Sequence, residues 1–443
     1  MLTELANWGN YPKLKGEVLY FKNTEELLSI VKSSEKLAVR GAGLSYGDAS
    51  LYKKVVSTEF FNKILAFDKE NGTITIESGV TLDQLLRHTV PQGWFLYVTP
   101  GTKFITVGGA IGGDIHGKNH HLEGSFCSYV ISMDVMLCDG TIISCNRESN
   151  AHIFHAACGG IGLGGIVIRA TIKLKRISTS FIKQENIIVH NLDHMMQLLE
   201  EKKSSTYVVA WIDCLTSPKK IGKGVLMLGE HAELHEIDSG NPLKIHRNPI
   251  FNIPFSLPFN ILNRYLVKVF NLLYFNKHKL SKKKFITHYD SFFYPLDSIK
   301  NWNRLYGKDG FLQYQFVLPT ETSMRGLREI LKRIVQSQQA SLLAVLKTLG
   351  ESENLISFPM PGATLALDFP VNDRVLTLLN ELDKIINDLG GRVYLVKDAR
   401  MESEFFHHSY PNLDKFKQII NQIDPNNKFT SSLARRLQIK QTE

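Results

Sequence analysis

The stretch Thr99–His121, TPGTKFITVGGAIGGDIHGKNHH, gives the strongest indication of the fold, because it places six glycines around and before a cationic cluster. The cluster consists of His116, Lys118, His120 and His121. Glycine has no Cβ, so its backbone reaches positive φ and its amide groups approach phosphates and flat rings closely. The segment therefore predicts a loop that lies against an anionic or planar ligand. The alternative is a glycine-rich turn between strands whose histidines are solvated.

Two further glycine-rich loops lie in the same half of the chain. The loop Arg40–Asp48, RGAGLSYGD, follows a short apolar run, and Cys158–Ile177 joins CGGIGLGG to a strand with alternating apolar residues. Neither Arg40–Asp48 nor Thr99–His121 reads G-x-G-x-x-G at the start of a helical pattern, which argues against a Rossmann dinucleotide site. Several such loops together favour one long ligand.

Composition indicates an ordinary globular protein. With 443 residues and 43% hydrophobic residues, the chain can bury a large core in two domains. Its five cysteines form no C-x-x-C pair, so we expect free thiols and no structural metal. The N-terminus lacks a basic region followed by an apolar core, and no apolar run approaches the roughly 20 residues that span a bilayer. These features predict a cytoplasmic location.

The formal net charge is +9, and much of the excess lies in six lysines in or directly after the apolar stretch 251–275. They are Lys268, Lys277, Lys279, Lys282, Lys283 and Lys284. Apolar bulk beside lysines is typical of a segment that rests on an anionic membrane surface, here the inner face of the membrane. The alternative is a mobile basic loop with a partly buried helix. No nucleic-acid-binding motif accompanies the charge, so we expect no nucleic-acid partner.

Three motifs carry a family resemblance. The R-G-x-G-x-S-Y-G-D loop, the T-P-G-T-x-x-x-T-V-G-G-A-I-x-x-D-I-H-G-K-N-H-H segment and the later G-G-x-G-L-x-G-I-x-x-R-A-T strand resemble the vanillyl-alcohol-oxidase type of FAD-dependent oxidoreductase, which has a PCMH-type FAD-binding domain. The resemblance continues through Phe311–Pro319, Ser357–Val371, Gly390–Arg400 and Ser431–Leu437, so it covers nearly the whole chain. The D-I-H-G-K-N-H-H motif is the most specific part.

The expected fold class is α+β. Short strands and helical pieces alternate in residues 1–178, and the middle of the chain has the pattern of an antiparallel sheet covered by helices. The resemblance implies a two-subdomain PCMH-type FAD-binding domain at 1–178 and a substrate-binding domain at 179–391. Residues 392–443 would then return to the FAD domain.

The resemblance implies FAD as cofactor. Backbone amides of the two glycine loops are the available donors for its pyrophosphate, and the serine hydroxyl of the first loop can add another. The predicted cofactor-binding residues are Arg40, Gly41, Ala42, Gly43, Leu44, Ser45, Tyr46, Gly47, Gly101, Thr106, Val107, Gly108, Gly109, Gly113, Asp114, Ile115, His116, Ile166, Val167 and Tyr394. Relatives that bind flavin covalently carry histidine in place of Leu44 and a cysteine near Thr102 or Lys103. This chain has neither, so we expect non-covalent FAD.

Lys397 and His116 are the catalytic candidates. Oxidation of an alcohol by flavin needs a base for the hydroxyl proton and a cation near the reduced ring. Lys397 lies in the β-like run VYLVKDAR, and its alternative role is an ion pair with Asp398 or another carboxylate. His116 either acts as the base or orients the sugar. The residues alone leave open which of the two accepts the proton.

Gln313 and Gln315 alternate in LQYQF, which places both amides on one face of a strand. By resemblance Tyr294, Lys118 and Lys347 join them in the substrate pocket, where the lysines can neutralise a phosphate. The chain departs from its mycobacterial-type relatives at three positions. Ala366 replaces a reactive cysteine, Thr364 an asparagine and Leu349 an aromatic residue.

The resemblance implies oxidation of the ribose 2'-hydroxyl of a lipid, polyprenyl-phosphoryl-β-D-ribose, with an NADH-dependent short-chain reductase completing the epimerisation to arabinose. One alternative is a sugar-alcohol or aldonolactone oxidase that acts on a soluble polyol. Another is a flavin-binding scaffold at the membrane without enzymatic activity.

Overall fold

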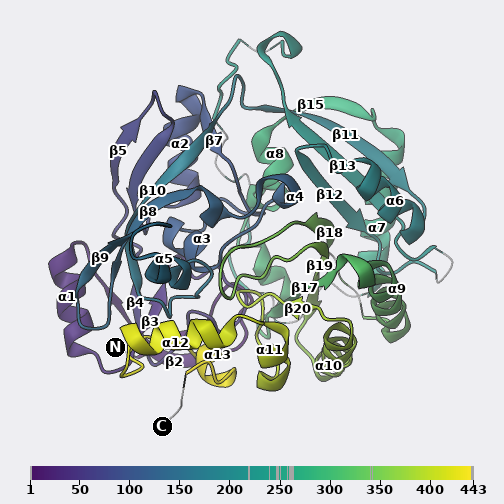
Figure 1. Cartoon of the computed structure of the whole chain (residues 1–443). Coiled ribbons are helices and arrows are strands. Elements are labelled where there is room, and N and C mark those ends of the chain that lie inside the picture. The colour runs from purple at the N-terminus through teal and green to yellow at the C-terminus, as the bar shows by residue number, and fades with distance from the viewer. Residues whose placement is uncertain are drawn as a thin grey trace.

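The computed structural model describes residues 2–217, 220–238, 240–245, 249, 251–256, 258, 264–339, 341 and 343–440. Residues 257 and 259–263 of the apolar stretch 251–275 lie outside the described residues. Three main sheets build the fold, as Figure 1 shows. The class is therefore α+β, as predicted.

The first sheet is small and has the strand order β1-β2-β4-β3. Its strands are β1 (Thr3–Leu5), β2 (Leu14–Tyr20), β3 (Ala38–Arg40) and β4 (Lys54–Ser57). Helix α1 (Thr24–Ser33) begins at Asn23, whose side chain accepts a hydrogen bond from the Glu26 amide, and it buries Leu27 and Val31. Because β3 ends at Arg40, the first glycine loop starts at the edge of this sheet.

The second sheet has the order β5-β6-β10-β8-β9, with β7 paired to β10. Its strands are β5 (Ile64–Asp68), β6 (Thr73–Glu77), β7 (Trp94–Leu96), β8 (Val130–Met136), β9 (Ile142–Cys145) and β10 (Ile166–Arg176). The helices in this part of the chain are α2 (Leu82–Thr89), α3 (Val107–Gly112), α4 (His120–Glu123) and α5 (Ala151–Ala157). The second glycine loop therefore contains the short helix α3 and leads into α4.

The third sheet is antiparallel throughout, with the order β15-β11-β13-β12-β18-β19-β17-β20. Its strands are β11 (Phe181–Val189), β12 (Tyr207–Ile212), β13 (Gly224–His231), β15 (Lys284–His288), β17 (Phe311–Pro319), β18 (Ala344–Leu349), β19 (Gly362–Pro370) and β20 (Arg392–Val393). A separate parallel pair joins β14 (Phe251–Asn252) to β16 (Ile299–Lys300). The other helices here are α6 (Leu192–Glu201), α7 (Arg264–Leu280), α8 (Tyr289–Phe293), α9 (Thr320–Ser337) and α10 (Asp373–Asp388).

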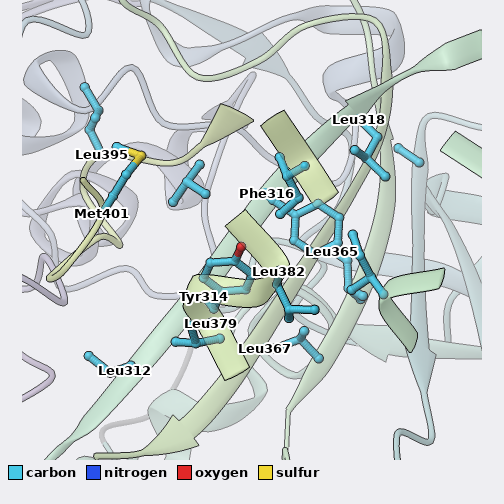
Figure 2. Packing of buried hydrophobic residues seen from close by; sticks show 14 of the residues in the cluster. Leu312, Tyr314, Phe316, Leu318, Leu365, Leu367, Leu379, Leu382, Leu395 and Met401 are labelled. Carbon is cyan, nitrogen blue, oxygen red and sulfur yellow. The ribbon is translucent and has the colours of Figure 1, made fainter. Parts of the chain in front are cut away.

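Alternating residues separate the two faces of this third sheet. On one face Phe316, Leu365 and Tyr314 pack with Leu379 and Leu382 of α10, as Figure 2 shows. Helices α6 and α9 contribute to the same core, so the sheet is covered by helices as predicted. The intervening residues of β17 and β19 face the other way, toward the second sheet.

The C-terminal helices return to the first sheet. They are α11 (Ser403–Ser409), α12 (Leu413–Ile423) and α13 (Ser432–Arg436). Leu37 forms an isolated parallel bridge with Phe429, and the Ser432 amide donates to the carbonyl of Leu51. The domain boundaries remain predictions. The one at 178 falls between β10 and β11, and the one at 391 falls one residue before β20, which still pairs with β17.

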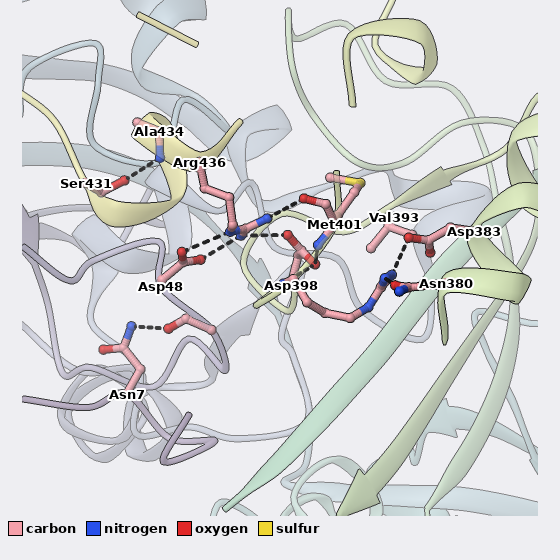
Figure 3. Close-up of polar contacts among 12 residues, drawn as sticks. Asn7, Asp48, Asn380, Asp383, Val393, Asp398, Met401, Ser431, Ala434 and Arg436 are labelled. Carbon is pink, nitrogen blue, oxygen red and sulfur yellow. Dashed lines mark hydrogen bonds and ion pairs between the residues drawn. The ribbon is translucent and has the colours of Figure 1, made fainter. Parts of the chain in front are cut away.

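Arg436 fastens this return. Its guanidinium binds Asp48 at 2.8 Å and Asp398 at 2.8 Å, and it donates to the carbonyl of Met401 (Figure 3). Both carboxylates are almost fully buried. Although burial alone would raise the pKa of Asp398, Arg436 and Arg400 hold it below its ordinary value. One side chain thus links the first glycine loop, the segment around Lys397 and α13.

We expect Arg436→Met to lower the free energy of unfolding by about 3–5 kcal/mol, because it leaves two buried carboxylates without their cation. The neighbouring Arg435→Met is the matched control. Arg435 is exposed and donates one hydrogen bond to the Tyr52 hydroxyl, so its loss should change stability by less than about 1 kcal/mol. Denaturant unfolding of both variants measures the difference. Equal midpoints for the two variants would contradict this account of Arg436.

Candidate active site

The polar face of the third sheet carries most of the predicted substrate residues. Cross-strand pairing places Gln313 opposite Asp368, Gln315 opposite Ala366, and Lys347 opposite Thr364. Paired residues of an antiparallel sheet point to the same face. Gln313 and Gln315 therefore lie on one face together with Lys347. Ala366 lies in the middle of this face.

His116 reaches this face through Gln315. The Gln315 amide nitrogen lies 2.9 Å from Nε2 of His116 and 3.2 Å from the hydroxyl of Thr364. Thr364 donates its own proton to the carbonyl of Phe316, so it can only accept from Gln315. The Gln315 side-chain nitrogen is therefore the donor to Thr364. The same nitrogen also donates to Nε2 of His116. A neutral imidazole that accepts at Nε2 carries its proton on Nδ1.

The surroundings of His116 keep its ring neutral. The side chain is buried and packs against the rings of Tyr394 and Phe358. Burial, followed by the positive charge of Lys347, lowers the pKa of His116 well below its ordinary value. Nδ1 has no hydrogen-bond partner among the described residues. Tyr394 is itself held by its hydroxyl, which donates to the carbonyl of Gly113 at 2.7 Å.

Lys397 lies in a turn and not in the β-like run that the sequence predicts. Strand β20 ends at Val393, and the Lys397 amide donates back to the carbonyl of Tyr394. Its Nζ lies 3.9 Å from the ring centroid of Tyr46, at van der Waals contact with the face of the ring. Asp398 is bound by Arg436, so the ion pair between Lys397 and Asp398 that the sequence left open does not form.

The charges near Lys397 oppose each other. The pKa of Lys397 is lowered to about 7: burial lowers it most, the carboxylate of Asp368 opposes this effect, and the charge of Lys347 lowers the pKa as well. A sizeable fraction of this side chain is therefore a neutral amine near neutral pH.

Asp368 was not among the predicted site residues. Its Oδ1 accepts a hydrogen bond from the Gln313 amide at 2.6 Å, while its buried Oδ2 has no partner in the described part of the chain. Burial raises the pKa of this carboxyl to about 7. The signal was present in ATLALDF, because Thr364, Ala366 and Asp368 alternate in step with the glutamines of β17.

Lys118 and Lys347 complete a cluster of three partly buried cations. Burial, followed by the charge of Lys347, lowers the pKa of Lys118 to about 7, and burial lowers that of Lys347 to about 8. Lys118 donates to the carbonyl of Phe292 and lies 4.1 Å from the centroid of its ring. Neither lysine has a carboxylate within ion-pair distance among the described residues. Lys118 and Lys347 therefore present positive charge that no described carboxylate pairs with, whereas Asp368 acts on Lys397.

The first glycine loop has the form that a pyrophosphate needs. The amides of Gly41, Ala42, Gly43, Leu44 and Ser45 donate no hydrogen bond to other described residues. Gly43 has φ +67°, and a Cβ there would overlap the guanidinium of Arg40. Arg40 is held below the loop by Asn7 and by the carbonyl of Ala6. Free amides beside a fixed arginine fit a pyrophosphate group.

The second glycine loop differs from expectation. The amides of Val107 and Gly108 donate to the carbonyls of Val80 and Ser78, and that of Gly109 donates to the Thr106 hydroxyl. These amides are therefore not available to phosphate, contrary to the prediction. They hold the loop in place instead, by hydrogen bonds to Ser78 and Val80. The sequence gives no sign of this pairing. A Cβ on Gly101 would meet no neighbouring atom, so open space remains there.

Four other predicted site residues are engaged within the protein. Asp114 accepts from the Cys127 amide and from the side chains of Asn354 and Ser357. The hydroxyl of Tyr294 is hydrogen-bonded to Thr99 in the buried interior. Ile166 and Val167 begin β10 with their side chains in the core, which leaves only their backbone for a ligand.

Lys103 also proves to be structural. Its ammonium forms an ion pair with Asp290, and its amide donates to Asp297 at 2.9 Å. Burial raises the pKa of Asp297 to about 6. These contacts fix the second glycine loop to α8 and to the segment that follows it. Lys103 is thus a buried, paired cation.

The free loop amides, the orphaned Nδ1 of His116 and the cationic cluster together fit FAD and an anionic substrate. Arg40–Gly47 would hold the pyrophosphate. Gly113–His116, backed by Tyr394, would border the flavin ring. The arrangement provides a neutral imidazole and an amine with a lowered pKa on one side of a buried sheet face.

Comparison with known proteins supports this arrangement. The family model described as FAD binding domain matches residues 17–146, and the one described as D-arabinono-1,4-lactone oxidase matches residues 363–437. The decaprenylphosphoryl-beta-D-ribose oxidase of Mycolicibacterium smegmatis is 33% identical over 98% of this chain and 97% of that protein. The L-gulonolactone oxidase of Mus musculus is 27% identical over 47% of this chain and 48% of that protein.

A third relative, the D-lactate dehydrogenase of Anaerostipes hadrus, is 32% identical over 40% of this chain and 41% of that protein. These partial matches share less than half of the chain, whereas the match to the Mycolicibacterium smegmatis protein extends over all three main sheets. The chain therefore belongs to the family of FAD-dependent oxidoreductases acting on CH–OH groups that includes the decaprenylphosphoryl-beta-D-ribose oxidase of Mycolicibacterium smegmatis.

Proposed function

We propose that the protein oxidises the ribose 2'-hydroxyl of a polyprenyl-phosphoryl-β-D-ribose to the 2'-ketone. The observation that carries the proposal is the pair Lys118 and Lys347, which have no carboxylate within ion-pair distance among the described residues, beside Lys397 and the neutral His116. A phosphodiester supplies the negative charge that these lysines lack. The relative that matches over nearly the full length of both chains is named as the oxidase of a substrate of this kind, decaprenylphosphoryl-beta-D-ribose. The product is the keto form of a sugar whose reduction gives the arabinose used in cell-wall polysaccharides.

Lys397 is proposed as the base. FAD, when bound, accepts the hydride that leaves the alcohol carbon. The neutral Nζ of Lys397 accepts the hydroxyl proton, and the resulting ammonium is stabilised by the face of Tyr46 at 3.9 Å and by the charge of Asp368. A base with a pKa near the working pH is the most effective one.

His116 is proposed as a positioning donor and not as the base. Its Nε2 already accepts from Gln315, so the free position is the protonated Nδ1. A donor of this kind holds an oxygen or a ring nitrogen in place but takes up no proton. This assignment favours Lys397 for the proton transfer, an alternative that the sequence alone left open.

The remaining polar residues bind the sugar phosphate. Lys118 and Lys347 neutralise the phosphate, and the Gln313 amide, fixed by Asp368, faces the sugar hydroxyls. The 2'-ketone is then the substrate of a separate NADH-dependent short-chain reductase. Because the lipid tail of the substrate stays in a bilayer, the enzyme is proposed to work at the membrane surface.

A second candidate is an aldonolactone or sugar-alcohol oxidase that acts on a soluble polyol. It is favoured by the match of residues 363–437 to the D-arabinono-1,4-lactone oxidase model and by the partial likeness to L-gulonolactone oxidase. A neutral polyol, however, offers no charge to the three lysines of the site.

We expect polyprenyl-phosphoryl-ribose to bleach the flavin of the purified holoenzyme under anaerobic conditions, while xylitol and arabinono-1,4-lactone leave it oxidised. The absorbance of the flavin band is measured after the holoenzyme is mixed once with each compound. Ribose 5-phosphate, which lacks the lipid, is the control for the contribution of the lipid. Bleaching by the polyol or lactone alone would establish the second candidate. Bleaching by none of them would favour a flavin-binding scaffold.

The pH dependence of flavin reduction tests Lys397. Below its pKa of about 7 the side chain is an ammonium and cannot accept a proton, so we expect the rate to rise with pH and to level off above neutrality. His116 stays neutral in this range and does not contribute. Asp368→Asn removes the charge that raises the pKa of Lys397, so the rising limb should move to lower pH.

The control for this measurement is Lys397→Met, loaded with FAD to the wild-type ratio. It should reduce FAD at least about a hundredfold more slowly and without the rising limb. An unchanged limb in this variant would remove Lys397 from the role of base. A limb that moves to higher pH in Asp368→Asn would contradict the electrostatic coupling between the two groups.

We expect acid precipitation of the protein to release all of its FAD into the supernatant. Residue 44 is leucine, which cannot form a bond to flavin, and Lys103 is buried in its ion pair with Asp290. The absorbance of supernatant and redissolved pellet measures the distribution. Yellow colour that stays in the pellet would show a covalent bond.

A further inference from the structure

Helix α7 has one stripe of buried residues. Val267, Asn271 and Phe275, spaced four residues apart, are its buried residues. Val267 packs with Tyr306 and Phe311, and the Asn271 amide donates to Asp213 at 2.7 Å. The stripe thus includes a polar residue with a polar partner. It accounts for how α7 is attached but not for the rest of its surface.

The opposite side of α7 is apolar and exposed. At about 100° per residue, the exposed apolar side chains fill the half of the helix that faces away from the buried stripe. They are Tyr265, Leu266, Val269, Phe270, Leu272, Leu273 and Leu280. Leu273 is 64% exposed and Leu280 is 86% exposed. A surface helix normally directs its apolar side inward, so this polarity is inverted. A continuous exposed apolar face of this kind marks a contact with another phase or molecule.

The charges around this face are all positive. Residues 239–289 contain nine Lys or Arg residues and no Asp or Glu. On the helical projection Lys268 and Lys279 border the apolar face on one side, and Lys277 lies near its other edge, between Leu266 and Phe270. None of these three forms an ion pair with another described residue, and all are exposed. Lys282 and Lys283 follow directly and are exposed as well.

We propose that the outward face of α7 docks in the plane of an anionic lipid surface, with its apolar side chains among the acyl chains and its lysines at the phosphates. Long lysine stems reach from the border of an apolar face to the headgroups. A second copy of this chain is a poorer occupant, because two such faces would bring their lysines together without acidic partners. None of the helices in the described part of the chain is long and apolar enough to cross a membrane, which agrees with a helix that lies flat.

The docking face is connected to the active site. Register places Trp211, Val345, Ala366 and Gln315 in one row across the third sheet. Tyr274 of α7 packs on Trp211 with ring centroids 4.8 Å apart. Helix α7 thus covers the far end of the sheet face that carries the site. In this respect the inference deepens and rests on the proposed lipid substrate, although docking itself is measured without any substrate.

The test is co-flotation of the holoenzyme with vesicles of phosphatidylcholine alone or with added phosphatidylglycerol. We expect binding to the anionic vesicles that weakens in high salt, and little binding to phosphatidylcholine. Val269→Glu/Leu273→Glu should lower the partition coefficient at least about tenfold. The matched control is Leu65→Glu, on exposed β5 at the other side of the molecule (Figure 1). Lys277→Gln/Lys279→Gln should weaken only the binding that depends on anionic lipid.

Equal binding of wild type and Val269→Glu/Leu273→Glu to anionic vesicles would overturn the proposal. So would a wild-type dimer in lipid-free sedimentation that this variant converts to a monomer, since the face would then bind a second copy. Flavin content and melting temperature, read on every variant, separate loss of docking from loss of folding. Because no substrate is added, failure of the proposed oxidation leaves the result of this experiment unaffected.

Discussion

Arg436 forms the contact on which the geometry of the site depends. It brings together Asp48 in the first glycine loop and Asp398 beside Lys397, two carboxylates that burial alone would destabilise. Asp398 also accepts the amides of Arg400 and Met401, so its oxygens are satisfied. It is therefore unable to pair with Lys397, its neighbour in the chain. Burial therefore lowers the pKa of Lys397 without an opposing ion pair from Asp398.

Charged groups that the fold holds in place despite burial also occupy the polar face of the third sheet. The charge of Lys347 disfavours the charged forms of His116, Lys118 and Lys397, and Asp368 opposes this effect at Lys397. A protein interior tolerates such a set only where the scaffold fixes each group. Here the scaffold is an antiparallel sheet whose other face is a continuous apolar core (Figure 2). Anionic ligands relieve the repulsion, which links the fold to the kind of substrate it can bind.

Local patterns made part of this arrangement predictable. The two-residue period of β17 places Gln313 and Gln315 on one face, and the same period in β19 would have placed Asp368 there as well. The glycine loops were recognisable because their residue types are needed for close backbone approach. The α+β class followed from the succession of short strands and amphipathic helices.

The remaining features depend on partners distant in sequence. The amides of Val107 and Gly108 look free in the sequence, but they bind carbonyls of a loop that only folding brings near. Lys397 follows an apolar run typical of a strand, yet pairing with β17 ends at Val393 and a turn begins. Tyr294 resembles a pocket residue until its hydroxyl is seen bound to Thr99. Propensity describes each segment by itself and contains no information about these contacts.

The sequence pattern of helix α7 also does not identify which of its faces is buried, and here the outcome bears on function. Its sequence has apolar residues on nearly every side, so periodicity cannot tell the inner face from the outer one. The inner stripe contains Asn271 because Asp213 is there to accept its amide, and the leucines are left outside. From the buried side, Val267 touches the cluster of Phe311 and Tyr46, and Tyr46 supports the ammonium of Lys397. The wall of the active site and the attachment of the apolar helix are thus one packed unit. A substrate whose tail stays in a bilayer would need to bring only its sugar phosphate from the surface beside α7 to this wall.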